Sequence, residues 1–123
     1  MSNQKNGKSN RILVLFIINK LRSLGLKSSH FGFKLIIRAI QLKLVDDEYS
    51  SLENTYKILA KETNKTIKQI EDCIYYAITH RNYNLSEDNF ENIFGYPYDE
   101  YIFSNKEFIE EFVSLIRIQT TSH

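Results

Sequence analysis

The stretch KTIKQIEDCIYYAITHR, residues 65–81, decides the fold because it predicts an amphipathic helix with a defined start. Its apolar residues recur at three- and four-residue steps, which is the spacing of a helix face that packs on a core. These residues are Ile67, Ile70, Ile74, Ala77 and Ile78. Thr66 and Gln69 match the T-x-x-Q capping box and fix the first turn. The opposite side mixes lysine, carboxylates and tyrosines, which raises the question of what that side serves.

The rest of the chain also shows helical spacing and no convincing alternation of strand type. We expect helices over residues 11–24, 30–45, 52–63, 66–81, 87–94 and 104–118. Gly25 should end the first helix, and Ser104 with Glu107 forms a second capping box at the last one. The pattern therefore predicts an all-α, single compact domain of about six helices.

The segments outside these helices are rich in polar residues or in turn formers. Residues 1–10 and 119–123 are expected to be tails, the first of them flexible. DDEYSSLEN (46–54) should be a loop or a short turn of helix. GYPYDEYIF (95–103) should be irregular, because it holds glycine and the chain's only proline.

Charge is distributed unevenly along the 123 residues, although the net charge is only +1. Residues 1–43 hold nine lysines and arginines and no acidic residue. Residues 82–123 hold two basic and eight acidic residues, a net charge of −6. A basic half favours attraction to a polyanion, although lysines that simply solvate helix surfaces would give the same count.

Several other functions lack a matching pattern. The single cysteine, Cys73, excludes an internal disulfide and a multi-cysteine zinc site, and the three histidines have no metal-site spacing. No nucleophile, paired carboxylates or phosphate loop can be identified, so we expect neither an enzyme nor a cofactor. The apolar run ILVLFII (12–18) is too short for a membrane span, and the start lacks a signal-peptide pattern. A soluble cytoplasmic protein without a membrane partner is the expectation.

The segment AKETNKTIKQI, residues 60–70, has the spacing of a helix-turn-helix. Ala60 would let two helices approach closely, Asn64 would turn the corner in a left-handed conformation, and Ile70 would pack the second helix. A plain antiparallel helix hairpin is the alternative. In a helix-turn-helix, residues 66–81 would form the recognition helix, which enters the major groove of DNA.

That interpretation assigns roles to the polar side of the helix. Lys65 and Lys68 would lie near phosphates, Gln69 could read adenine, and Glu71 could accept from cytosine. The candidate DNA-binding residues are Lys65, Thr66, Lys68, Gln69, Glu71, Asp72, Tyr75, Tyr76 and Arg81. Asp72 is discordant, because a carboxylate near phosphate costs energy unless a lysine or a base amino group pairs with it.

Three ordered segments resemble a known family: LRSLGLKSSHFGFKLIIRAI (21–40), YKILAKETNKTIKQIEDCIYYAI (56–78) and IFGYPYDEYIFSNKEFIEEFVSLI (93–116). The chain resembles the C-terminal DNA-binding effector domain of the stage-zero sporulation response regulator of endospore-forming bacteria. The resemblance implies a six-helix domain with a helix-turn-helix in helices three and four. It also implies sequence-specific binding of double-stranded DNA and transcription control, often as a tandem dimer.

Two departures from the family pattern matter. Family members carry an N-terminal receiver domain, whereas about ten polar residues stand there in this chain, so we expect no phosphorylation switch. The family's recognition helix places arginines around a glutamate. Here Glu71 stands at the glutamate, while its neighbours are Gln69, Asp72 and Tyr75. Bidentate arginine contacts to guanine are therefore missing, and the target sequence should differ or the affinity should be weaker.

Two functions follow from these observations. The first is a stand-alone transcriptional regulator that binds DNA. The second is a protein-interaction module with weak or no DNA binding, which pairs as a homodimer or as a heterodimer with a related regulator. Its possible dimer surface is the last helix, at Phe108, Phe112 and Ile116.

Overall fold

The fold is built from helices alone in the residues that the structure, a computed structural model, describes: 2–45, 51–97 and 104–121. In chain order the helices are α1 (Ser2–Ser23), α2 (Phe31–Val45), α3 (Leu52–Thr63), α4 (Ile67–Thr79), α5 (Tyr83–Phe94) and α6 (Asn105–Thr121). The prediction of an all-α single domain with six helices is confirmed. The expected loop around residues 46–50 and most of the irregular stretch 95–103 lie outside the described residues.

Three helices are longer than the sequence pattern predicts. α1 begins at Ser2, where a flexible tail was expected over residues 1–10, and α6 continues to Thr121. α5 begins at Tyr83, four residues before the expected start, because Asn82 caps it by accepting the N–H groups of Asn84 and Leu85. Extending an existing helix needs no new nucleus, so polar residues without proline can join it at little cost.

The turn after α1 is set by Gly25, as the sequence predicted. Its φ is +90°, a conformation that glycine adopts at no steric cost. The Leu26 N–H donates to the Leu21 carbonyl at 3.0 Å, and the Gly25 N–H donates to the Arg22 carbonyl at 2.9 Å. These two bonds form the Schellman motif, which satisfies the last carbonyls of α1. The Gly25 carbonyl in turn accepts the Asn82 N–H at 2.8 Å, which joins this turn to the start of α5.

The turn between α3 and α4 also follows the prediction. Asn64 has φ 58° and ψ 37°, the left-handed conformation, and the Lys65 N–H donates to the Ala60 carbonyl at 3.1 Å. The capping box of α4 is present: the Thr66 hydroxyl accepts the Gln69 N–H, and the Gln69 side chain accepts the Thr66 N–H. Together they hold the two helices in one fixed orientation.

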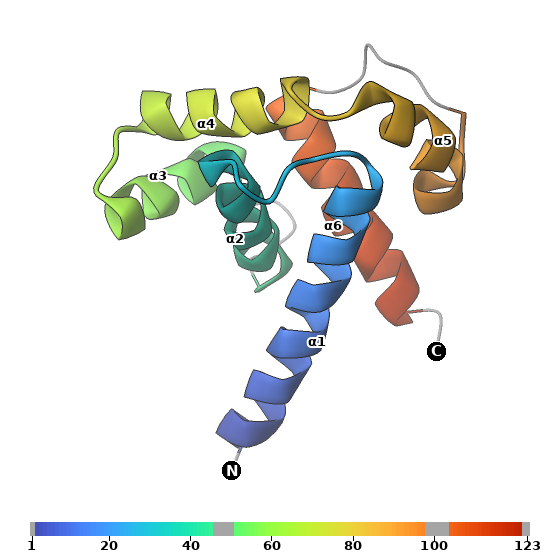
Figure 1. Cartoon of the computed structure of the whole chain (residues 1–123). Helices are drawn as coiled ribbons and strands as arrows, with labels where there is room; N and C mark the ends of the chain where they lie inside the picture. Colours follow the sequence, from blue (N-terminus) through green and yellow to red (C-terminus); the bar gives the residue numbers. More distant parts are fainter. Residues whose placement is uncertain (1, 46–50, 98–103, 122–123) are drawn as a thin grey trace.

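The core lies around α2, which packs against α3, α4 and α6. Figure 1 shows α4 lying across the N-terminal end of α2, and the first turns of α1 extending beyond the other helices. Gly32 makes the crossing of α2 and α4 possible, because a Cβ there would clash with the Cys73 carbonyl. The largest fully buried side chains are Ile17, Leu21, Leu24, Ile36, Ile40, Leu59, Ile70, Ile74, Ile78, Phe90, Phe108 and Phe112.

Candidate nucleic-acid interface

The polar side of α4 faces away from the core. We call Lys68, Glu71, Asp72, Tyr75 and Tyr76 the outer face of α4. The side chains of Lys68 and Asp72 are 80% and 62% exposed, and Tyr75 is 57% exposed. This side of the helix is therefore accessible to a macromolecular partner along its whole length.

Asp72, the discordant residue of the sequence pattern, has a partner within the helix. The Lys68 ammonium lies 3.1 Å from the Asp72 carboxylate, in the i,i+4 arrangement that neighbouring turns of a helix bring together. Both groups are largely in water, so the pair adds no more than a few tenths of a kcal/mol to stability. The pair offsets the charge of Asp72, and the Glu71 carboxylate leaves the outer face with a net charge of −1.

Gln69 is engaged in the cap rather than free to read a base. Its side-chain oxygen accepts the Thr66 N–H at 2.9 Å, while the Thr66 hydroxyl accepts the Gln69 N–H at 3.1 Å. A bidentate contact to adenine uses the amide oxygen as well as the nitrogen. With the oxygen in the cap, the amide nitrogen of Gln69 is the part that can reach a ligand.

Tyr76 belongs to an aromatic cluster that the sequence analysis did not identify. Its ring stacks on His80 with the centroids 3.7 Å apart, and the His30 ring meets it edge-on at 5.0 Å. Tyr76 and His80 are one helical turn apart, and this i,i+4 spacing was the available signal. The contact with His30, which precedes α2, depends on how the helices pack and had no signal in the sequence.

Lys65 marks the N-terminal end of the outer face. Its ammonium lies 5.0 Å from the centroid of the Phe31 ring, so the start of α2 supports the lysine side chain. A cation over an aromatic face is attracted by the ring quadrupole. The cation is thereby held beside the first turn of α4, where the free helical N–H groups also favour an anion.

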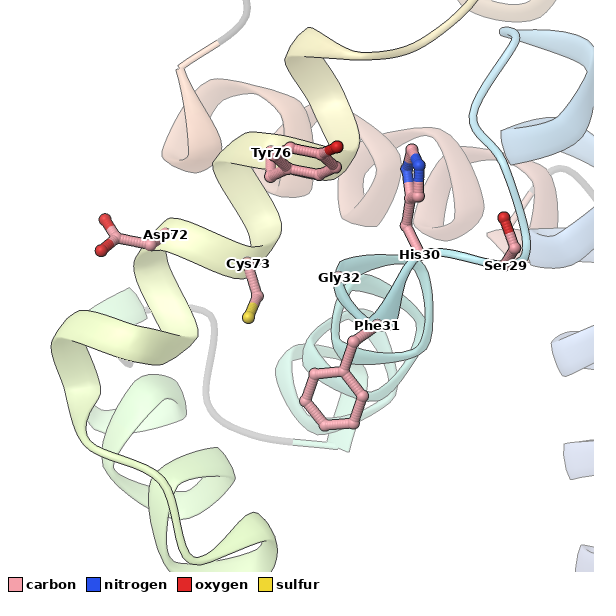
Figure 2. Close-up of a pocket in the computed structure, with 7 residues that line it drawn as sticks. All are labelled: Ser29, His30, Phe31, Gly32, Asp72, Cys73 and Tyr76. Carbon is pink, nitrogen blue, oxygen red and sulfur yellow. The ribbon is translucent and has the colours of Figure 1, made fainter.

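A hollow of about 440 Å³ lies between the start of α2 and α4. Figure 2 shows the Cys73 sulfur and the Phe31 ring bordering the gap between the two helices, while Asp72 points away from α2. The rings of Phe31, His30 and Tyr76 and the Cys73 side chain make its walls largely apolar, and Ser29 adds a hydroxyl. This chemistry suits the flat, apolar parts of a nucleotide or an aromatic side chain better than a charged group.

Arg81 is not a DNA-binding residue, and that prediction is wrong. The side chain is buried, with 4% exposure. Its Nε donates to the Ser86 hydroxyl and its Nη1 to the Ile78 carbonyl, each at 2.8 Å, and the guanidinium lies over the Tyr83 ring. Arg81 thus ties the end of α4 to α5.

The proposed dimer surface on the last helix is also wrong. Phe108 and Phe112 are fully buried and Ile116 is nearly so. The stripe that they form packs against α2 and α4 of the same chain. Asn105 adds a polar link at the start of α6, because its side-chain amide donates to the Glu71 carbonyl at 3.0 Å.

An ion pair joins α2 to α3. Arg38 donates to Glu62 through Nε at 2.9 Å and through Nη2 at 2.7 Å. The hydrogen bonds to Arg38 lower the pKa of Glu62, and those same bonds raise the pKa of Arg38. The charge of Arg38 is therefore offset by Glu62. Any attraction of phosphates to this region would come from other cations around α4.

Metal and membrane sites gain no support from the described part of the chain. There, no three histidine, cysteine or acidic side chains come together in a way that could hold a metal ion. None of its helices has the length and apolar character needed to cross a membrane.

No protein-family model, curated protein or solved structure matches the chain. The fold and its surface chemistry therefore carry the functional argument.

Proposed function

We propose that this domain is a sequence-specific transcriptional regulator that binds double-stranded DNA through α3 and α4. In this proposal the two helices and the Asn64 turn act as a helix-turn-helix, and the outer face of α4 enters the major groove. The observation that carries the proposal is the open outer face of a capped helix, fixed against a second helix by a left-handed turn. The 13 residues of α4 span about 20 Å along the helix axis, and the major groove, about 12 Å wide, admits an α-helix.

The charges indicate which residues would contact phosphates and which would contact bases. α4 itself holds one lysine and two carboxylates. We therefore expect it to contact base edges more than phosphates. The phosphate contacts would come from cations next to it, such as Lys65 at its start and the exposed Lys34 on α2. Phosphate contacts position a protein on the duplex, and contacts to base edges specify the sequence.

The base contacts would differ from those of an arginine-rich recognition helix. Glu71 and Asp72 can accept from the amino group of cytosine, and the Tyr75 hydroxyl can donate or accept. The outer face contains no arginine that could make a bidentate contact to guanine. The resemblance to the sporulation effector domains supports the same function, together with a different target sequence and a dimer on DNA.

The direct test is a fluorescence anisotropy titration with duplexes selected from a random-sequence pool. Binding should weaken steeply as salt increases, because each neutralised phosphate releases counterions. Lys65→Ala should weaken binding to all duplexes, because it removes a phosphate contact, while Arg11→Ala, on the exposed side of α1, should leave it unchanged. A folded protein that selects no duplex and gives no anisotropy change at low salt would refute the function.

Gln69 offers a sharper variant of this test. Gln69→Glu keeps an oxygen acceptor for the Thr66 N–H and so keeps the capping box, but it removes the amide donor. It should change which duplexes are selected without lowering helix stability. Gln69→Ala should change the selected duplexes and also lower helix stability. Comparing the two variants therefore separates the contact to a base from the capping of the helix.

A second candidate function is a protein-interaction module without DNA binding, formed by pairing with a second copy. It is favoured by one observation: Ile12 and Leu15 are 61% and 60% exposed, one helical turn apart on α1. Light scattering after gel filtration would give the molar mass. A dimer that Leu15→Lys converts to a monomer, together with no duplex binding, would favour this candidate over the first.

A further inference from the structure

A second hollow lies at the junction of α1, α5 and the segment that leads into α2. Its volume is about 430 Å³, and its polar lining consists of Arg22, Lys27, Ser28, Ser29 and Asn82. Ser29 also lines the hollow between α2 and α4. The two hollows are therefore neighbours, and this one extends the candidate interface past the Tyr76 end of α4.

Most of the lining surface is apolar, and Leu26 and Leu85 contribute to it. The polar groups of the lining can donate hydrogen bonds, and none of them is a carboxylate. Arg22 and Lys27 are exposed, and the ion pairs found among the described residues, Arg38–Glu62 and Lys68–Asp72, involve neither of them. Two cations that face a common recess without an acidic partner favour an anion. Arginine in particular matches the geometry of phosphate oxygens.

The neutral groups of the hollow add further donors. Ser28 and Ser29 occupy the corner of a turn closed by the His30 N–H, which donates to the Lys27 carbonyl at 3.1 Å. Both serines are exposed and carry hydroxyls that can donate. The Asn82 side-chain oxygen accepts the N–H groups of Asn84 and Leu85, which leaves its amide nitrogen to donate toward a ligand.

The walls of the hollow are fixed by hydrogen bonds between α1, its turn and α5. The Gly25 turn is held to Asn82 by a backbone hydrogen bond, and a Cβ on Gly25 would clash with the Asn82 carbonyl. From α5, the Ser86 hydroxyl donates to the Leu24 carbonyl, and the Asn89 side chain donates to the Ser23 carbonyl at 2.8 Å. The backbone that carries the donors is thus fixed, and the exposed Arg22 and Lys27 side chains are the parts that become ordered when an anion binds.

We propose that this hollow binds a backbone phosphate of the DNA duplex whose major groove receives α4. The proposal rests on the proposed function and adds to it a phosphate clamp outside the helix pair, formed by Arg22, Lys27 and the two serines. Lys65 stands at one end of the outer face and this hollow lies beyond the other. A duplex would then be held by phosphates on both sides of the reading helix.

The test compares Arg22→Gln with Lys27→Gln and with the double variant in anisotropy titrations over a range of salt concentrations. The double variant should bind duplex about tenfold more weakly at low salt, which is the loss expected when one charge-assisted phosphate contact disappears. Its plot of log affinity against log salt should be shallower by about one. Arg11→Gln is the matched control, since it removes an exposed arginine from the same helix outside the hollow, and it should bind like the wild type. Thermal melting of each variant checks that the fold is intact.

Inorganic phosphate, titrated into the free protein and followed by amide NMR shifts, separates the sources of the anion. If the wild type binds duplex and the double variant binds it equally well, the clamp is refuted while the proposed function stands. If the wild type binds no duplex but phosphate shifts the amides of Lys27, Ser28 and Ser29, the hollow is a free-anion site, and both the DNA clamp and the proposed function fail. If neither ligand binds, both proposals fail as well.

Discussion

The two faces of α4 follow different physical rules. On the inner face, Ile70, Ile74, Ala77 and Ile78 have no exposure, and α2 approaches so closely that only glycine fits at position 32. On the outer face, Lys68 and Asp72 pair with each other inside the helix. Packing in the core therefore restricts which residues fit on the inner face. The fold does not restrict the outer face in this way, so binding to a partner can determine its residues. The following predictions test that difference, from the largest expected effect to the smallest.

Two adjacent positions of α4 give the strongest contrast. Ile74→Ala should lower the free energy of unfolding by about 3–4 kcal/mol, because it removes buried methyl groups and leaves a cavity. Tyr75→Ala, one residue further on the outer face, should change stability by about 0.5 kcal/mol or less. Urea denaturation of both variants measures the difference. Similar losses would mean that the outer face is packed against other parts of the chain.

Gly32 tests the close approach of α2 to α4, and Gly95, after α5, serves as its control. Gly32→Ala should cost about 2–3 kcal/mol, since the new methyl group would meet the Cys73 carbonyl and lie 2.9 Å from the Ala77 Cβ. Gly95→Ala meets no atom within 4 Å, but its φ of +84° should cost about 1 kcal/mol. Denaturation midpoints would rank the two. A tolerant position 32 would show that the helices can separate.

The capping box at the start of α4 should contribute a smaller amount to stability. Thr66→Ala removes the hydroxyl that accepts the Gln69 N–H and should cost about 1 kcal/mol. Thr66→Ser keeps the hydroxyl and should be close to neutral. A loss of helical circular dichroism on heating, measured for both variants, would reveal the difference. Equal stability of the two variants would show that the cap does not hold the start of α4.

The smallest effect concerns pH. The pKa of Glu62 is lowered in the folded protein, chiefly by its hydrogen bonds to Arg38. The folded state therefore binds the proton less tightly than the unfolded chain. The stabilisation is present above the ordinary carboxyl pKa and disappears as the pH falls through the lowered value. Because both side chains are partly exposed, the effect should stay below about 1 kcal/mol.

A double-mutant cycle isolates that contribution. The stability of Arg38→Gln and of Glu62→Gln should fall less on acidification than that of the wild type, and the double variant should add nothing further. Urea denaturation at neutral pH and at acidic pH gives the four values. An unchanged pH dependence in both single variants would show that the pair contributes nothing measurable.

Local signals in the sequence predicted the helix pair well. The residue range of α3, the left-handed Asn64 and the capping of α4 by Thr66 all follow from short-range chemistry that a sequence displays directly. The length of α1 was underestimated, because Ser, Asn and Gly read as a tail when no apolar face accompanies them. These residues simply extend a helix whose nucleus lies further along the chain.

Long-range packing explains what the sequence did not predict. Arg81 looks like a surface cation, since arginine is seldom buried, and its hydrogen bonds to Ser86 and the Ile78 carbonyl help to make its burial favourable. The apolar spacing of Phe108 and Phe112 on α6 predicts that this side of the helix is buried. The spacing does not distinguish burial against α2 from burial against another molecule. The His30 cluster likewise forms only when the segment before α2 meets α4, and the hollow around Arg22 only when α1 and that segment meet α5.

The central claim is that the outer face of α4 contacts duplex DNA. Amide chemical-shift mapping by NMR, with isotope-labelled protein and the duplex that it selects, tests this claim most directly. The account predicts that the largest shifts fall on Lys68, Asp72 and Tyr75, while the C-terminal half of α6 stays unchanged. Shifts confined to other helices, or no shifts at low salt with folded protein, would contradict it.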